Sequence, residues 1–245
     1  MKTINYNGAA GQDKFVLNIN KFKKDGYFLE FGSQEPISCN NTYLLESEYG
    51  WKGLMFEWEE KYAPKYEKYR GEDTTYIIGD AVEHDYSELF AKLEVPEVID
   101  YLQIDLEPGM LTPLTLLQKL NEQVMDKHKF ATITFEHDIY CGEQNSKHNV
   151  GGEWNGWRPY DYTDFHKVRD ESRKILEERG YVRVFSDVND NDNYNLPFED
   201  WWVHPDLVDM DYVNEVISQN ADLYCEGVVS ASTIYGRNIE YGENS

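Results

Sequence analysis

Acidic side chains stand in, at or just beyond the ends of five apolar runs in the first 140 residues. They are Glu30, Glu57, Asp80, the pair Asp105 and Glu107, and the stretch from Glu136 to Asp138. If the runs are parallel strands, their carboxyl ends meet along one edge of a sheet, and these acids meet there too. Carboxylates accept hydrogen bonds from hydroxyls and amines, and they repel phosphate oxygens. The edge therefore favours S-adenosylmethionine (SAM), a cation with a ribose and no phosphate, over NAD.

Gly32 and Glu57 indicate how such a ligand is held. Gly32 follows the first run in the stretch GYFLEFGSQEP, and Glu57 ends the second run a little over twenty residues later. An acidic residue at that place binds ribose hydroxyls in Rossmann-like folds. A carboxylate at a strand end is also commonly a helix cap. The spacing alone leaves both interpretations open.

The apolar runs and the segments between them predict the elements that position these acids. We expect strands at 27–31, 54–57, 75–78, 101–105 and 131–136. Segments with helical periodicity separate them, at 41–49, 61–69, 86–93 and 113–125. Short apolar strands that alternate with helices predict an α/β fold with a doubly wound parallel sheet, whose ligands bind at the carboxyl ends of the strands.

The pattern changes after Glu136. The polar stretch at 141–160, which holds Trp154 and Trp157, predicts a lid or substrate loop. A helix with a charged, solvated face is expected near 164–180, followed by two strands of an antiparallel edge pair at 181–188 and 198–205, and a closing helix within 204–219. We expect one domain over 1–245, with residues 1–25 as an N-terminal extension.

The composition excludes several classes of partner. The formal charge is −23, from 23 basic and 46 acidic residues. Lysine and arginine supply most of the affinity for nucleic acids and anionic membranes, so neither is an expected partner. Three cysteines without a paired spacing, and no apolar segment of signal or membrane-span length, predict a cytoplasmic protein.

Four segments resemble a known family. The segment from Gly26 to Tyr62, GYFLEFGSQEPISCNNTYLLESEYGWKGLMFEWEEKY, resembles the opening of FkbM-type methyltransferases. There a D-x-G-A-x-D-G-like turn is followed by S-N-T, a leucine-rich helix, G-W-x-G-L and E-P. YLQIDLEPG resembles the family's later D-x-E-G-x-E, and FATITFEHD with SRKILEERGYVRV resembles its fifth strand and next helix. The resemblance extends over roughly 26–184.

The resemblance implies a class I SAM-dependent O-methyltransferase with a Rossmann-like, mostly parallel seven-stranded sheet. Glu57 would hold the ribose, Asp80 would lie near the adenine, and Asp105 and Glu107 would lie on the methyl-donor side. The cofactor contacts carried over are Glu30, Gly32, Ser33, Glu35, Asn41, Thr42, Glu57, Asp80, Ala81 and Asp105.

The sequence departs from the family pattern in the cofactor turn and after the fourth strand. Pro36 stands where the family prefers glycine, and Pro108 and Met110 replace a glycine and a glutamate. Proline fixes φ near −65° and removes an N–H donor, so a turn that needs positive φ at that position could not form. A second hypothesis is therefore a non-catalytic binding or interaction module of the same fold.

Methyl transfer also needs a group that removes the acceptor's proton. The candidate bases are Asp105, His137, Asp138 and, in the polar stretch, His148. Alternatively, carboxylates at 105, 136 and 138 could bind Mg²⁺, because hard cations prefer oxygen ligands. We expect the acceptor to be a hydroxyl of a small molecule or glycan. The sequence predicts neither the acceptor's identity nor the oligomeric state.

Overall fold

The computed structural model describes residues 4–107, 111–140, 162–189, 197–219 and 229–230. The expected lid at 141–160 lies outside these residues, together with His148, Trp154 and Trp157, and so do Pro108 and Met110. Among the described helices, none is both long and apolar enough to cross a membrane.

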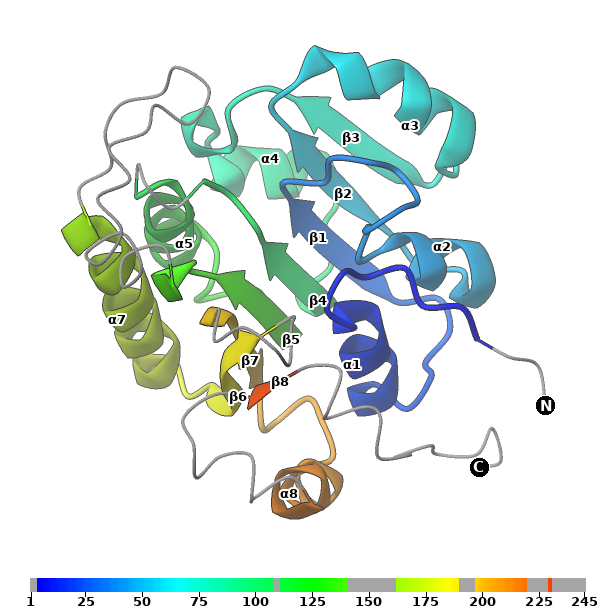
Figure 1. The fold of residues 1–245 in the computed structure, drawn as a ribbon. Helices are drawn as coiled ribbons and strands as arrows, with labels where there is room; N and C mark the ends of the chain where they lie inside the picture. The colour runs from blue at the N-terminus through cyan, green and yellow to red at the C-terminus, as the bar shows by residue number, and fades with distance from the viewer. Residues whose placement is uncertain (1–3, 108–110, 141–161, 190–196, 220–228, 231–245) are drawn as a thin grey trace.

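A single twisted sheet organises the chain (Figure 1). Its strands are β1 (Tyr27–Phe31), β2 (Lys52–Glu57), β3 (Thr74–Ile78), β4 (Val98–Ile104), β5 (Lys129–Glu136), β6 (Val182–Asn189), β7 (Pro197–Val203) and the two-residue β8 (Val229–Ser230). The order across the sheet is β3-β2-β1-β4-β5-β7-β6-β8. β1 to β5 pair in parallel, and β7 is antiparallel to both β5 and β6. The predicted doubly wound, mostly parallel sheet with antiparallel last strands is confirmed.

Helices cover both faces of the sheet (Figure 1). On one face lie α1 (Gln12–Ile19), α2 (Tyr43–Tyr49), α3 (Ala63–Tyr69) and α8 (Met210–Gln219), which share a core with β1, β4 and β7. We call this the α1 face. On the other, the α5 face, lie α4 (Tyr86–Lys92), α5 (Thr112–Gln123) and α7 (Tyr162–Glu178). Because the central strands are buried on both sides, they read as continuous apolar runs.

Residues 12–19, which we expected in an N-terminal extension, form α1 on the sheet. Phe15 of this helix is 1% exposed and stacks on Trp201 of β7, with ring centroids 4.9 Å apart. Its neighbours Val16 and Ile19 are buried too, so the helix presents apolar residues at helical spacing. Gln12, in the first turn of α1, makes a side-chain hydrogen bond with Glu199 of β7, which places that turn near the carboxyl-terminal end of β5.

Candidate active site

The strand order reverses between β1 and β4, and this is the switch point at which doubly wound sheets bind ligands. Gly32 follows β1 and Asp105 follows β4, and the two backbones lie in contact there. Gly32 has φ +85°, and a Cβ at this position would lie 1.8 Å from the carbonyl oxygen of Asp105. Only glycine accommodates both the positive φ and the close approach. The glycine predicted from the sequence is therefore required by the fold at this point.

The turn after Gly32 is tied to the end of β2. The Glu57 carboxylate accepts the backbone N–H of Gln34 at 2.8 Å and that of Glu59 at 2.9 Å, one on each oxygen. The Tyr66 hydroxyl donates to the carbonyl of Gln34 at 2.7 Å. Gln34 itself has φ +44°, so these bonds hold a conformation that side chains rarely adopt. Each oxygen of Glu57 keeps a lone pair for a hydroxyl donor.

Glu30 lies on the α1 face, inside a buried network behind the same turn. Its carboxylate accepts from the Thr42 hydroxyl at 3.0 Å and the Asn40 amide at 3.3 Å, with an Arg70 nitrogen 3.8 Å away. Burial raises the pKa of Glu30, while Arg70 and the hydrogen bonds oppose that rise. The Asn40 Oδ1 accepts the N–H groups of Thr42 and Tyr43 at the start of α2, at the position where the family pattern has a serine.

The remaining predicted cofactor residues lie around this turn. Ser33 donates its hydroxyl to the carbonyl of Phe56 at 3.2 Å, and Asn41 is 4% exposed. Glu35 is half-exposed and pairs with Lys65. Asp80 caps a short 3₁₀ helix, η2 (Ala81–Glu83), by accepting the Val82 N–H at 3.0 Å, and Ala81 is buried. The structure brings these residues to one edge, and their contacts with a cofactor stay a prediction.

Three acids form a row across neighbouring strands beside the switch point. Ile104 pairs with Phe135, so that Asp105 and Glu136 follow as neighbours, and Glu136 pairs directly with Glu199 of β7. We call Asp105, Glu136 and Glu199 the acid row. We did not single out Glu199 from the sequence. The signal in the sequence that could have indicated it is the position of this glutamate within the otherwise apolar run FEDWWVHP.

Burial raises the pKa of every member of the acid row. For Asp105, hydrogen bonds with Glu136 and Gln103 oppose the rise. The pKa of Glu136 lies well above its usual range because of burial and the charges of Asp105 and Asp138. That of Glu199 is also well above the usual range, through burial and the charge of Asp105, although the Trp201 indole N–H donates to it at 2.7 Å. Asp105 and Glu136 can therefore share a proton, which suits proton transfer.

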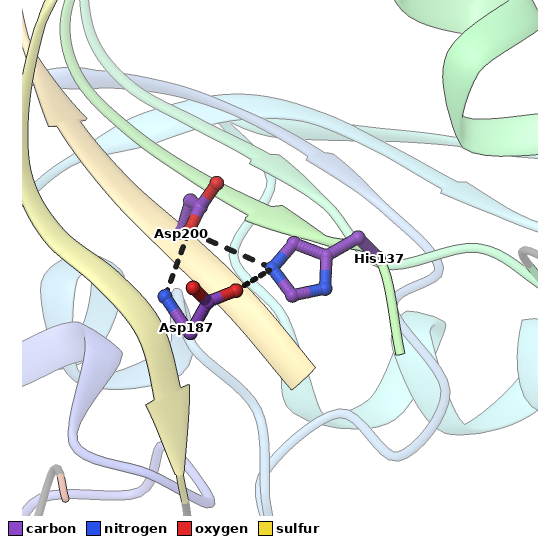
Figure 2. Close-up of side chains that lie close together, drawn as sticks. All are labelled: His137, Asp187 and Asp200. Carbon is purple, nitrogen blue, oxygen red and sulfur yellow. Dashed lines mark hydrogen bonds and ion pairs between the residues drawn. The ribbon is translucent and has the colours of Figure 1, made fainter. Parts of the chain in front are cut away.

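His137 follows Glu136 in the chain, and its ring points toward Asp187 and Asp200 (Figure 2). It is fully buried, and its Nε2 lies 3.6 Å from one oxygen each of Asp187 and Asp200. Its Nδ1 accepts the N–H of Ile139 at 3.2 Å. His137 thus belongs to a buried polar cluster, and its predicted role as a base is untested.

Arg173 of α7 neutralises the two aspartates of that cluster. Its guanidinium donates to Asp187 at 2.7 Å and to both oxygens of Asp200, at 2.7 and 2.8 Å. Burial would raise the pKa of Asp200, but Arg173 and His137 hold it well below the usual range. Within the described residues, His137, Asp187 and Asp200 are the group whose spacing could suit a metal ion. The guanidinium already occupies both carboxylates, so we assign no cation to them. The charged face of the helix at 164–180, which we expected to be solvated, is therefore partly directed toward Asp187 and Asp200 through Arg173.

The sequence matches no family model and no curated protein. Solved structures share the fold. An O-methyltransferase from Bacillus cereus in complex with SAH (S-adenosylhomocysteine) is 16% identical, with 78% of this chain and 80% of that one covered, at a TM-score of 0.50. A DUF574 family protein from Streptomyces avermitilis is 12% identical, with 80% and 83% covered, at a TM-score of 0.52. The chain therefore has the Rossmann-like fold found in the Bacillus cereus methyltransferase.

Proposed function

We propose that this protein is a SAM-dependent methyltransferase that methylates a hydroxyl group of a small molecule or glycan. The supporting observation is the edge where Gly32, Glu57 and Asp105 adjoin at the switch point of the sheet. The same fold occurs in an O-methyltransferase in complex with SAH. Membership of the FkbM-type family belongs to this proposal and rests on the sequence segments alone.

The side chains at this edge suit the chemistry of the methyl donor. Glu57 offers two lone pairs, which match the neighbouring hydroxyls of a ribose. Trp58 comes directly after Glu57, is 63% exposed and offers an aromatic face to an adenine ring. Lys65, a cation near the turn, is already paired with Glu35. The edge is thus rich in acceptors, as a cationic donor without phosphate requires.

The residues on the acceptor side have a defined task in the reaction. When bound, SAM supplies a methyl group on a positively charged sulfur. The acceptor oxygen forms a bond to that carbon, the carbon–sulfur electron pair stays on the sulfur, and the hydroxyl proton must leave. We assign this proton to Asp105, with Glu136 beside it, because the pair shares protons readily. Asp138 is the alternative base, and His137 is less suited because its Nε2 faces Asp187 and Asp200.

A binding measurement tests the donor site directly. We expect SAH to bind the purified protein in isothermal titration calorimetry, and Glu57→Ala to weaken it by about 10- to 100-fold, since hydrogen bonds to a charged group are lost. Glu60→Gln is the matched control, because Glu60 is an exposed acid three residues away. Unchanged affinity in Glu57→Ala would show that the ribose lies elsewhere.

A second candidate function is a non-catalytic module of the same fold. One observation at the turn favours this second function. Glu30 and Thr42 contact each other and Arg70, so their polar groups already have partners within the protein. A folded protein that shows no heat and no thermal shift with millimolar SAH or SAM would support this candidate and exclude the methyltransferase.

A further inference from the structure

The acid row crosses three adjacent strands on the α1 face, directly beside Gly32. The row is continuous because Asp105 follows Ile104 of β4, whose partner Phe135 precedes Glu136, and Glu136 pairs with Glu199. Like charges directly opposite each other destabilise a strand pair. Glu136 and Glu199 occupy such a position, so a cation between them would relieve an unfavourable contact.

No basic side chain of the described residues forms an ion pair with Asp105, Glu136 or Glu199. Some buried acids near the sheet differ in this respect. Asp200 and Asp187 are held by Arg173, and Glu30 lies beside Arg70. Asp13 and Glu57 also lack a basic partner among the described residues, but they accept backbone N–H groups instead. In the described part of the chain, no guanidinium or ammonium group pairs with the acid row. Burial is the main cause of the raised pKa values of Glu136 and Glu199.

A buried amide next to the row also lacks a donor. Gln103 is 3% exposed, and its Nε2 donates to Asp105 at 3.4 Å. Its Oε1 is buried and has no hydrogen-bond partner among the described residues. A buried carbonyl oxygen is rarely left unpaired. Together with the three carboxyls, it forms a group of acceptors that needs a ligand rich in N–H donors.

The length of the row selects among cations. Neighbouring strands lie about 4.8 Å apart, so the backbone positions at the two ends of the row are about 10 Å apart. A single metal ion contacts ligands at only about 2 to 2.5 Å, so it cannot touch both ends. The row also does not form a three-residue group of metal-ligand spacing within the described residues. An organic molecule with amino groups a few atoms apart can bond along it.

We propose that the acid row binds the methyl acceptor through ammonium groups, so that the acceptor is an amine-bearing alcohol such as an amino alcohol or an amino sugar. This proposal rests on the proposed function, because it assigns the row to the acceptor of that reaction. An ammonium between Glu136 and Glu199 donates to both, and a hydroxyl near Asp105 lies next to Gly32 and the methyl donor.

The test uses 1,3-diamino-2-propanol as probe and glycerol as its control, since each ammonium is replaced by a hydroxyl of similar size. With SAH present, we expect the diamine to bind in calorimetry at least tenfold more tightly than glycerol. Binding should also release protons near pH 7, because ammonium groups favour the charged carboxylates. Titration in two buffers of different ionisation enthalpy measures that release.

Isosteric variants locate the site. Glu199→Gln and Glu136→Gln should each weaken the diamine about tenfold or more and reduce proton release, while SAH affinity stays within a few-fold. Glu97→Gln is the control, because its carboxylate is highly exposed on the segment that precedes β4. Thermal unfolding of each variant shows that it is folded.

Three results would overturn the proposal: equal binding of glycerol and the diamine, unaltered diamine binding in Glu199→Gln and Glu136→Gln, or binding of Mg²⁺ but not of the diamine. Any of these with normal SAH binding leaves the methyltransferase proposal intact. Loss of SAH binding alone contradicts the proposed function, whereas diamine binding that depends on the row would still support the cation site.

Discussion

At the scale of single residues, Gly32 fixes the geometry of the switch point. We expect Gly32→Ala to lower the free energy of unfolding by about 3 kcal/mol, because the new Cβ would lie 1.8 Å from the carbonyl oxygen of Asp105 and the backbone would have to move. SAH binding should weaken with it. Urea denaturation at constant m-value measures the first effect.

Gly180 provides a control for the backbone angle alone. Its φ is +83°, close to the +85° of Gly32, yet a Cβ there meets no atom within 4 Å. Gly180→Ala should therefore cost only about 1 kcal/mol, the usual penalty for a left-handed non-glycine residue. Equal losses in the two variants would mean that the contact with Asp105 contributes nothing beyond φ.

The residues that could be predicted from the sequence are those with a local signal. Gly32 and Glu57 followed from the end of a strand and the spacing between them, and the structure does place them at one turn. Glu199 had only a weak local signal, an acid within an apolar run, and Arg173 had none, because the roles of both depend on contacts between residues far apart in the chain. His137 was assigned to the ligand edge from its place after β5. The ring's direction toward Asp187 and Asp200 depends on β6 and β7, which sequence periodicity does not position.

At the scale of elements, Arg173 ties α7 to β6 and β7. We expect Arg173→Met to lower stability by about 3 kcal/mol, because the buried Asp200 loses both guanidinium hydrogen bonds and keeps only Arg183 at 3.9 Å, while Asp187 keeps Arg169 at 3.4 Å. Lys174→Met is the matched control on the next residue, whose side chain is 73% exposed, and should change stability by less than about 0.5 kcal/mol. Chemical denaturation of both variants at pH 7 gives the comparison.

The pH dependence of the stability lost in Arg173→Met distinguishes the contribution of the Arg173 charge from that of its side-chain packing. The pKa of Asp200 is depressed in the folded protein, so its contribution is present above the ordinary aspartate pKa near 4 and is lost as the pH falls below it. The difference between wild type and Arg173→Met should therefore narrow at pH 3. A difference that stays constant from pH 7 to pH 3 would indicate that the methylenes of Arg173, not its charge, provide the stability.

Elements were easier to predict than their arrangement. The five parallel strands were read from continuous apolar runs, since strands buried on both faces leave that pattern. The order of the last strands could not be read, because β7 enters between β5 and β6 through pairings that no local pattern encodes. α1 was not predicted, since residues 1–25 were assigned to an extension, although Phe15, Val16 and Ile19 have helical spacing.

At the scale of the whole molecule, the acidic residues fall into two groups, exposed and buried, whose effects on stability respond differently to salt. The formal charge of −23 includes many surface acids, whose mutual repulsion is screened by salt. Five other carboxyls have raised pKa values because they are buried: Asp13, Glu30, Asp105, Glu136 and Glu199. Salt screens a buried charge much less. The two contributions can therefore be told apart by measuring stability against pH at low and high salt.

Because these five buried carboxyls have raised pKa values, we predict that the free energy of unfolding falls as the pH rises. A carboxyl with a raised folded pKa keeps its proton in the native state after the unfolded chain has lost it, so its stabilisation is full below the unfolded pKa and is lost as the pH passes the folded pKa. We expect the free energy of unfolding in urea to be greater at pH 5.5 than at pH 8, and the difference to persist in 0.5 M NaCl. Each retained proton contributes a slope of about 1.4 kcal/mol per pH unit.

Glu199→Gln should flatten this dependence of stability on pH and stabilise the protein at pH 8, because it removes one charge that burial disfavours. A slope that disappears in high salt, or a Glu199→Gln variant with the wild-type slope, would place the effect in the surface charge instead.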